Sequence, residues 1–364
     1  MNILVLAPSL RTIACSYFAD QSRQALRQAS IHGPFSEATA ISQLLTQLTA
    51  DARAMGGKID LISIIVPYGG ERFAGPVLAG SQTLDDLEAL AQQAPLHLPV
   101  CRLLLQEIRG AFPHLPVAMS FQTAFFVGLP PREQFYGLEA SSHPRLRRFG
   151  YHGLFHAAAC RHAAHLCQEH LQGPARVLSI CLDKRPELAA VAGRRPLMVT
   201  SGATPMEGLP GETACGELDP SIVLALSSRL HLGPEQINQM LTRDSGIAAL
   251  AGSAVNLDSV LSPTSSHRLA RDLLRYRILL ACGMGIAALG GLDAIVFSGR
   301  YAQAGRTLGP YLLGKLAYAC PAARKAAQEI VSVDLHRLAA DEAHLVAVRQ
   351  PDQLAMKSTG TAAL

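Results

Sequence analysis

The sequence predicts an α/β protein of two domains. Its 364 residues exceed what one ordinary hydrophobic core holds, which favours two domains of comparable size. Short strand-like segments alternate with segments of helical periodicity, as in α/β folds with substantial parallel sheet. Apolar residues make up 49% of the chain and charged residues only 16%, a composition typical of a well-buried α/β fold.

Each half of the chain contains three strand-like segments next to glycine-containing turns. The strands are expected at 2–9, 59–70, 115–121, 175–183, 188–203 and 292–300, and helices at 36–55 and 265–290. The halves therefore look like two versions of one plan, although no residue-level repeat is visible. Such a pair of domains is expected to have a cleft between them, lined by "FGYHG" (149–153) and "TSGATP" (200–205).

Composition also limits location and partners. The net charge of +4 is small and forms no cluster, which argues against nucleic acid or an acidic membrane as a partner. The longest apolar run, 278–292, is shorter than the roughly 20 residues of a membrane span and predicts a buried helix, a Gly-Gly turn and a strand. The start of the sequence predicts a strand rather than a signal peptide. Eight scattered cysteines without a CxxC pair predict reduced thiols and a cytoplasmic protein.

The segment "TSGATPMEGLPGETACGELDP" (200–220) is built like an anion-binding loop. It is rich in hydroxyl groups and glycines, yet it carries four acidic residues and no Arg or Lys. Asp219 followed by Pro220 predicts a helix that begins here, with Asp219 as its N-cap. The missing positive charge is the feature that any functional interpretation has to explain.

Several motifs occur in an order that resembles one known family. They are "PYGGE" (67–71), "APLHLP" (94–99), "FQTAFFVGLP" (121–130), "RRFGYHGLFH" (147–156), the 200–220 loop, "DSGIAALAGS" (244–253), "GGLDAIVFSGR" (290–300) and "ADEAHLVA" (340–347). With them the chain resembles the acetate kinase (acetokinase) family over almost its whole length. The resemblance implies the duplicated sugar kinase–Hsp70–actin-like (ribonuclease H-like) fold, with an N-terminal domain at 1–126, a C-terminal domain at 127–342, and the segment 343–364 packed back on the first.

The family reaction converts ATP and a short-chain carboxylate into ADP and an acyl phosphate. The resemblance implies that His152 contacts the transferring phosphoryl group, as the first histidine of the family pattern "GFHGTSH" does. Tyr151 and Pro205 fall where the family lines its apolar pocket for the carboxylate, and Thr204 is a further donor expected at the substrate.

The family also uses ATP with Mg²⁺, and the resemblance extends to those sites. Glu342 matches the acidic Mg²⁺ contact of the family's C-terminal motif, although Ala343 stands beside it. The residues expected at the nucleotide are Thr200, Ser201, Asn256, Gly299 and Arg300.

Much of the family's catalytic set is missing. The opening substrate loop, the two catalytic arginines, the catalytic aspartate and the glycines of the phosphate loops are replaced. The replacing residues are Ala7, Leu10, Ala14, Ile65, Ala214, Gln122, the segment "CLDKR" (181–185), the segment "GRYAQA" (299–304) and, at the adenosine contacts, Asn256, Leu257 and Asp258. Because phosphoryl transfer depends on cations and hydrogen-bond donors around the phosphoryl group, these losses predict a degenerate active site.

Several features allow more than one interpretation. His152 either contacts an oxyanion, packs as a relic, or is an ordinary hydrogen-bonded histidine. The helix with His156, His162, His165, His170 and two cysteines either binds a metal or presents a solvated face, the simpler interpretation. New cations at the phosphate loops either fill the vacated space, bind another anion or point to solvent; they are Arg11, Lys184, Arg185 and Arg300.

Three hypotheses of function follow. The chain is a working acetate or propionate kinase by a modified route, a catalytically silent binding or regulatory homologue, or an enzyme for another reaction of a carboxylate or acyl phosphate. By resemblance, a homodimer is expected. The expected small-molecule partners are a carboxylate or acyl phosphate and a nucleotide.

Overall fold

The computed structural model describes residues 1–9, 12–20, 22, 24–33, 35, 38–54, 58–94, 97–138, 146–167 and 173–350. The chain forms two compact units. The first contains Met1–Val127 and the C-terminal segment from Asp334, and the second contains Gly128–Val333. The domain limits expected from the sequence, 1–126 with 343–364 and 127–342, stay a prediction.

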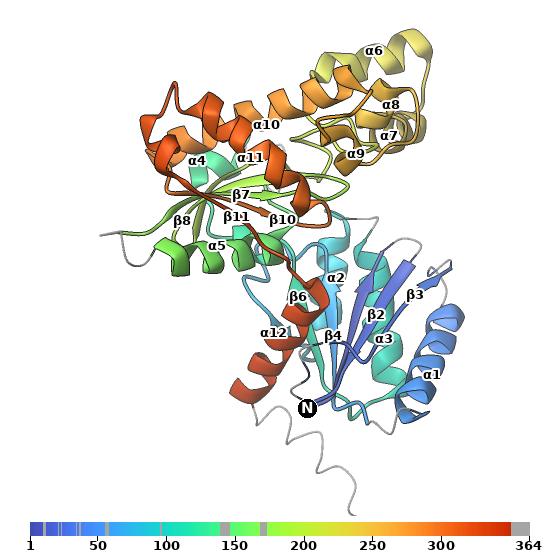
Figure 1. Ribbon diagram of the computed structural model, residues 1–364. Coiled ribbons are helices and arrows are strands. Elements are labelled where there is room, and N and C mark those ends of the chain that lie inside the picture. Colours follow the sequence, from blue (N-terminus) through green and yellow to red (C-terminus); the bar gives the residue numbers. More distant parts are fainter. Residues whose placement is uncertain are drawn as a thin grey trace, which may run out of the picture. The chain divides into compact units, whose positions relative to one another are not determined.

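The first unit is built on a six-stranded sheet (Figure 1). Its strands are β1 (Ile3–Pro8), β2 (Thr12–Phe18), β3 (Arg27–His32), β4 (Leu61–Val66), β5 (Val77–Leu78) and β6 (Val117–Phe121). The order is β3-β2-β1-β4-β6-β5, with β1, β4 and β6 parallel and the other strands antiparallel to their neighbours. β4 and β6 are buried along their whole length, as expected for parallel strands covered on both faces.

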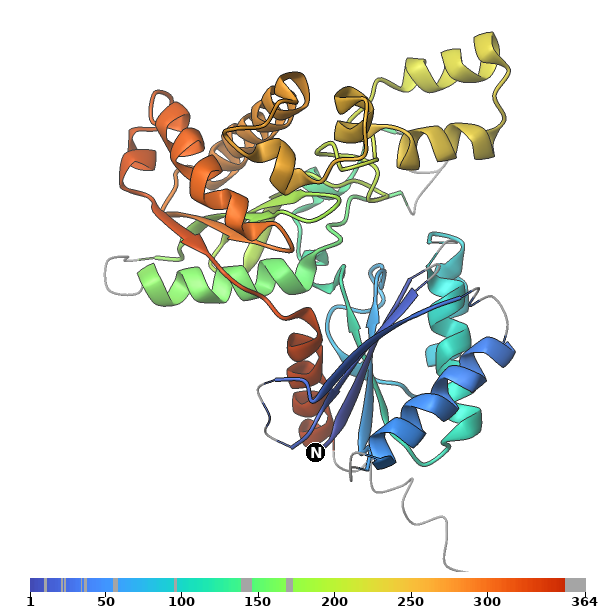
Figure 2. The same cartoon turned by 45° about the vertical axis from the view of Figure 1, so that its right-hand side comes forward.

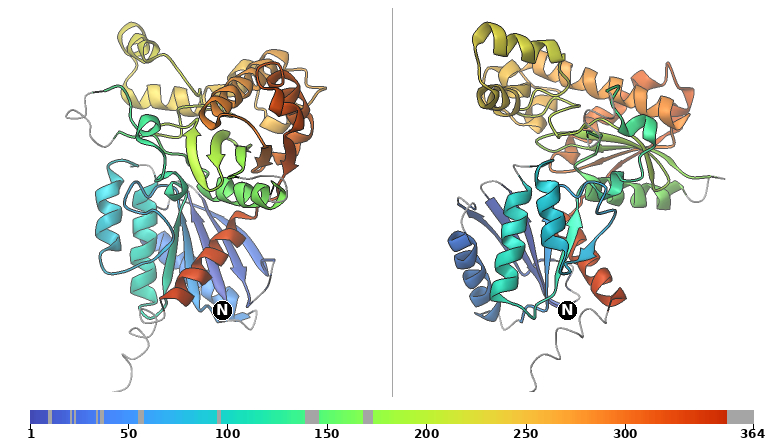
Figure 3. Two further views of the ribbon diagram at one scale, coloured as in Figure 1. Left: turned by 90° about the vertical axis from the view of Figure 1, so that its left-hand side faces the viewer. Right: turned by 180° about the vertical axis from the view of Figure 1, so that it is seen from behind.

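Helices cover both faces of this first sheet. On one side pack α1 (Ala38–Ala54), α2 (Thr83–Ala91) and α3 (Leu98–Ala111), and a short 3₁₀ turn, η1 (Ala124–Phe126), follows β6 (Figure 3). The other side is covered by α12 (Leu335–Arg349), which contacts β1, β4 and β6. Ser63 in β4 donates its hydroxyl hydrogen to the carbonyl oxygen of Ala339 in α12 at 3.1 Å. The last described helix therefore belongs to the core of the first unit.

The second unit repeats this sheet plan. Its strands are β7 (Arg176–Cys181), β8 (Glu187–Ala192), β9 (Arg195–Val199), β10 (Ala294–Ser298) and β11 (Ala327–Ile330), in the order β11-β10-β7-β8-β9. β8 and β9 form an antiparallel meander on β7, whereas β10 and β11 are parallel to β7. Apart from β5, which the second sheet lacks, the strands of the two sheets pair in the same order, and the predicted duplicated fold is confirmed.

The helices of the second unit also lie on both faces of its sheet (Figure 1). One face is covered by α5 (Gly153–Cys167) and the other by α10 (Arg268–Leu289) and α11 (Gly305–Leu316). The remaining elements are α4 (Pro131–Gln134), α6 (Pro220–Leu230), α7 (Pro234–Arg243), α8 (Gly246–Ala251), α9 (Leu257–Leu261), η2 (Ala302–Ala304) and η3 (Pro321–Lys325). The α6–α7 pair projects away from the sheet of this unit (Figure 2), and α6 has no buried residue.

Most predicted elements are present, and local signals explain their ends. Asp219 caps α6 by accepting the Ser221 N–H at 2.8 Å, with Pro220 as the first helical residue, which confirms that prediction. The helix α10 ends at Gly290 with a φ of 69°, and β10 follows, as predicted for the long apolar run. Among the described residues, no helix combines the length and the hydropathy that a membrane span requires.

The single strand predicted at 188–203 is wrong. The segment forms a hairpin of β8 and β9, because Gly193 adopts a φ of 63° and reverses the chain. The sequence prediction also missed β2, β3, β5 and β11.

Candidate functional site

His152 stands immediately before α5 and is half-buried. Its Nε2 lies 3.0 Å from the carbonyl oxygen of Arg185. Because a carbonyl oxygen only accepts hydrogen bonds, Nε2 carries the proton and donates it to Arg185. The backbone N–H of His152 donates to the Oε1 atom of Glu187 at 3.0 Å. Both donors of the predicted catalytic residue are thus engaged with the segment 185–187.

Glu187 is the centre of this site, and sequence reasoning missed it. Its side chain is 1% exposed, at the beginning of β8. It accepts the Tyr151 N–H at 2.8 and 3.1 Å and the His156 Nε2–H at 3.1 Å, together with the Ser201 hydroxyl hydrogen. Burial acts to raise the pKa of Glu187, but the hydrogen bonds that its carboxylate accepts, that from His156 first, outweigh it and lower the pKa to about 2. Glu187 is therefore an ionised carboxylate inside the protein.

His156 is the buried side-chain partner of this carboxylate. Burial lowers the pKa of His156, although the hydrogen bond to Glu187 acts to raise it, so we assign a neutral ring with the proton on Nε2. Its Nδ1 then accepts the hydroxyl hydrogen of Ser179 in β7, 2.8 Å away. The pair carries one negative charge, which the N–H groups at the beginning of α5 offset.

The histidines of α5 do not gather at a metal. His156 is buried, whereas His162 and His165 are exposed, and His170 lies outside the described residues. Within the described part of the chain, no group of three or more His, Cys, Asp or Glu side chains could hold a metal ion. His162 and His165 lie on a solvated face, whereas the simpler interpretation is wrong for His156, whose side chain is in the core.

The 200–220 loop closes over the Glu187 centre. Tyr151 donates its hydroxyl hydrogen to the Ala203 carbonyl oxygen at 2.6 Å, and Thr200 Oγ1 accepts the Leu188 N–H at 3.0 Å. Thr204 is exposed, and its Oγ1 accepts the Met206 N–H at 3.4 Å, beside the half-buried Pro205. The structure therefore brings Tyr151, His152, Thr200 and Ser201 to one place, with Thr204 and Pro205 further along the loop.

The segment 181–185, predicted as the altered phosphate loop, uses its backbone groups within the chain. The Leu182 N–H donates to the Ser298 carbonyl oxygen at 2.8 Å, and the Lys184 N–H to Asp183 Oδ1 at 2.7 Å. The Lys184 carbonyl oxygen accepts the Glu212 N–H at 2.8 Å. A phosphate cradle needs unoccupied N–H groups, so these bonds do not fit one.

The remaining predicted nucleotide residues lie near this segment or at helix ends. Gly299 has a φ of 88°, and Arg300 Nε lies 3.7 Å from Asp183 Oδ1. Asn256 caps α9 by accepting the Ser259 N–H at 2.8 Å. Among the new cations, Lys184 and Arg300 are exposed, Arg185 is half-buried, and Arg11 lies outside the described residues.

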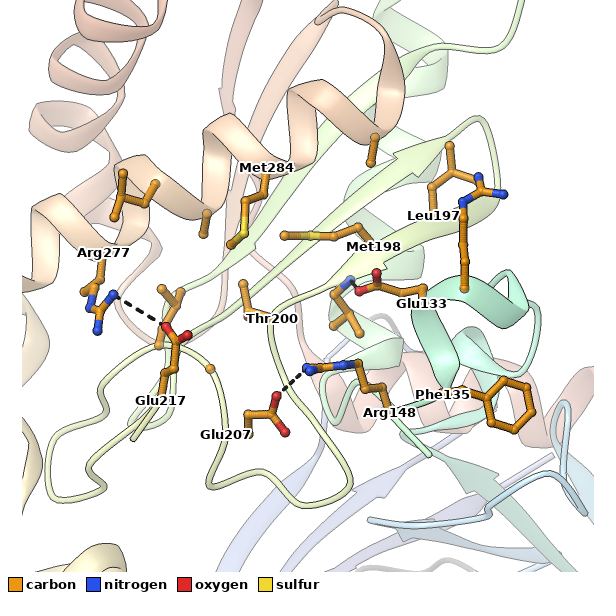
Figure 4. A pocket seen from close by; sticks show the side chains of 17 residues that line it. Glu133, Phe135, Arg148, Leu197, Met198, Thr200, Glu207, Glu217, Arg277 and Met284 are labelled. Carbon is orange, nitrogen blue, oxygen red and sulfur yellow. Dashed lines mark hydrogen bonds and ion pairs between the residues drawn. The ribbon is translucent and has the colours of Figure 1, made fainter. Parts of the chain in front are cut away.

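A separate cavity of about 750 Å³ lies in the second unit, between β9 and α10 (Figure 4). Its lining is mixed: apolar side chains such as Met198 and Met284 lie beside charged ones. Arg277 and Glu217 are 3.5 Å apart, and Arg148 forms an ion pair with Glu207. Of the predicted site residues only Thr200 lines this cavity, which the sequence did not reveal.

The paired sheets define the class of protein. Two units with the same strand order and helices on both faces are the duplicated sugar kinase–Hsp70–actin-like architecture. The model of the acetokinase family matches residues 14–316, and the chain belongs to this family.

Individual relatives agree with this assignment. The chain is 30% identical over 280 residues to the acetate kinase of Thermosipho africanus, covering 74% of this chain and 68% of that protein. It is 31% identical over 250 residues to the acetate kinase of Helicobacter acinonychis, covering 66% and 62%. The chain thus spans about two thirds of the curated relatives that it matches.

Solved structures share the fold over nearly the whole chain. A propionate kinase from Francisella tularensis has a TM-score of 0.80 at 21% identity, and the match covers 95% of this chain and 99% of that chain. The acetate kinase of Porphyromonas gingivalis has a TM-score of 0.79 at 21% identity, with the same coverage. At this identity the likeness establishes the fold.

The family implies Mg²⁺, for which Glu342 was the expected ligand. Glu342 lies in the second turn of α12, half-buried, and is followed by the buried Ala343. Among the described residues, Glu342 belongs to no group of three or more His, Cys, Asp or Glu side chains that could hold a metal ion. Mg²⁺ is usually held by one or two carboxylates together with water and substrate phosphates, so Glu342 as one such ligand stays a prediction.

Proposed function

We propose that this chain is an acetate/propionate kinase homologue in which phosphoryl transfer between ATP and a short-chain carboxylate is strongly reduced. The family supplies the reaction, with ATP and Mg²⁺ as its cofactors. The observation that carries the proposed reduction is the engagement of His152: its Nε2 proton is donated to the Arg185 carbonyl oxygen at 3.0 Å. A histidine held in this way contacts a phosphoryl group only after that bond breaks.

The bonds of the neighbouring loop support the same proposal. The N–H of Lys184 donates to the carboxylate of Asp183, so this N–H group is engaged and a negative charge lies in the loop that would bind a nucleotide phosphate. Repulsion between this carboxylate and a phosphate opposes binding. The rebuilt loop therefore weakens nucleotide binding as well as catalysis.

The replaced catalytic residues add to this reduction. Ile65 and Ala214, at the positions of the family's arginines, are 4% and 3% exposed and bring no charge to a transition state. The loss of one transition-state arginine costs about 10³ to 10⁵ in rate. The effects of losing several residues that stabilise the same transition state do not simply add. We therefore expect the rate of phosphoryl transfer to be reduced by at least about 10³.

A working kinase with relocated cations is the second candidate. Arg300 favours it, because its side chain is 58% exposed and only loosely paired with Asp183 at 3.7 Å. A guanidinium in this state is available to an anionic ligand.

An assay of ADP release with Mg²⁺–ATP and either acetate or propionate separates the candidates. We expect a rate at least about 10³ below that of an acetate kinase of the family assayed alongside. His152→Ala is expected to change this residual rate little, as is His165→Ala, a control on the exposed face of α5. A rate within about tenfold of that kinase, lost in His152→Ala and in Arg300→Ala, would establish the second candidate instead.

We further propose that the protein assembles as a homodimer through α10. Tyr276, Leu280 and Met284 follow one another at four-residue spacing on this helix and are 55%, 41% and 57% exposed. Residues at this spacing share one helix face. An exposed apolar stripe of this kind is typical of a surface that a partner covers.

The variant Met284→Glu places a charge at the C-terminal end of that stripe. We expect it to raise the dimer dissociation constant at least about tenfold, because an unpaired charge would be buried in the interface. Light scattering after size-exclusion chromatography measures the change. Tyr318→Glu is the control, since Tyr318 is 86% exposed and follows α11 rather than belonging to the stripe on α10. Equal dimer fractions in the two variants would contradict an α10 interface.

A further inference from the structure

The beginning of α5 holds a carboxylate that belongs to the chain itself. The two residues that lead into the helix, Tyr151 and His152, donate their backbone N–H groups to Glu187 at 2.8 and 3.0 Å. The beginning of a helix carries the positive end of the helix dipole and unpaired N–H groups, so it favours a bound anion. In this protein that anion is the buried side chain of Glu187.

Other donors at the same spot are directed to this carboxylate. His156 donates its Nε2 proton to Oε1 at 3.1 Å, and the Ser201 hydroxyl group donates to the same side chain. Backbone N–H groups, an imidazole and a hydroxyl are the donors with which proteins bind phosphate and other oxyanions. These donors form an oxyanion-binding arrangement, and the carboxylate of Glu187 accepts their hydrogen bonds in place of a ligand.

We propose that Glu187 excludes a phosphate or acyl phosphate oxyanion from the beginning of α5 by occupying its place. This inference rests on the proposed loss of phosphoryl transfer and names the residue that enforces it. A phosphate brought to Tyr151 N–H and His152 N–H would meet both the volume and the negative charge of the Glu187 side chain. His152 would remain directed to Arg185.

The variant Glu187→Ser tests this directly. Serine removes the charge and most of the volume of the group to which the two N–H groups and the His156 imidazole donate, so a phosphate could take the place of the carboxylate. Glu187→Gln removes the charge alone, since its amide still fills the position and its oxygen still accepts the N–H groups. Glu133→Ser is a matched control: Glu133 is a partly buried carboxylate that accepts the Val199 N–H at 3.0 Å, away from α5.

The experiment is a calorimetric titration of the four proteins with inorganic phosphate. We expect Glu187→Ser to bind phosphate at least about tenfold more tightly than the wild type, because charge-assisted hydrogen bonds become available. The wild type, Glu187→Gln and Glu133→Ser are expected to bind it equally weakly. If folded Glu187→Ser binds phosphate no better than Glu133→Ser, Glu187 is not the excluding residue.

The proposal can still be tested if the Glu187→Ser variant does not fold in buffer. If Glu187→Ser loses cooperative thermal unfolding in buffer, phosphate is expected to restore it, whereas chloride at equal ionic strength is not; absence of this rescue overturns the proposal. The outcome is also separate from the activity assay. Robust wild-type turnover would refute the proposed function, whereas the phosphate titration decides the role of Glu187.

Discussion

Replacing His156 with leucine is expected to lower the free energy of unfolding by about 1.5 to 3 kcal/mol at neutral pH, as for the loss of a hydrogen bond to a charged group. The substitution leaves the ionised Glu187 buried without its imidazole donor, and it removes the partner of the Ser179 hydroxyl group. Urea denaturation of the variant and the wild type measures the difference. His165→Leu is the control on the same helix, because His165 is exposed, and it should change stability by less than about 0.5 kcal/mol. A loss below about 1 kcal/mol in His156→Leu would contradict a charged Glu187.

The same carboxylate predicts how stability depends on pH. Glu187 has a pKa of about 2 in the folded protein, against an ordinary value of 4.5. Its contribution is therefore complete above about pH 4.5 and is lost as the pH falls towards 2, where the folded protein also takes up the proton. Wild-type stability is expected to decline across this range, and Glu187→Gln should flatten the decline. An unchanged slope would assign the acid sensitivity to other carboxylates.

The second large effect is expected from Gly246→Ala, a loss of more than about 3 kcal/mol in the free energy of unfolding. Gly246 begins α8 with a φ of 67°, a conformation that costs an alanine about 1 to 2 kcal/mol. Its new Cβ atom would also lie 2.8 and 2.9 Å from the backbone oxygen and nitrogen of Ala214, and against the Gly211 oxygen. The loop that contains Ala214 would have to move.

Gly252→Ala separates these two costs. Gly252 ends α8 with a φ of 68°, and nothing lies within 4 Å of a Cβ atom built on it. Only the conformational cost of about 1 to 2 kcal/mol is therefore expected. Denaturant unfolding curves of both variants give the comparison. If the two variants lose the same free energy of unfolding, the 211–214 loop moves easily away from the new Cβ atom. The close contact of Gly246 with Ala214 would then not determine the position of α8.

The fold could be predicted because its signals are local. Buried strands such as β4 and β10 are short apolar runs, and Asp219 and Pro220 mark a helix start by their own chemistry. β3 was missed because this edge strand alternates exposed and half-buried residues and carries little apolar signal. The hairpin of β8 and β9 was predicted as one strand because apolar residues continue on both sides of Gly193.

The site was harder to predict because it depends on contacts between distant segments. An acidic residue such as Glu187 is normally exposed, so a buried charge was not expected at this position. Only the fold brings it to Tyr151 and His152, 36 and 35 residues earlier. The one available signal was the acid at the edge of the apolar segment "LAAVA", which an α/β sheet would bury. Sequence reasoning instead gave the catalytic role to His152 and left the role of the cations Lys184, Arg185 and Arg300 open.

The packing of α12 on the first sheet has a consequence for how the protein is made. During synthesis, β1, β4 and β6 emerge early, but the helix that covers one of their faces is translated only after residue 334. The second unit is continuous from Gly128 to Val333 and can complete its core in the meantime. The second unit, which lies between the two segments of the first unit in the sequence, can therefore fold before the first unit does. Until α12 has been translated, the face of the first sheet that it covers is exposed to chaperones and to aggregation.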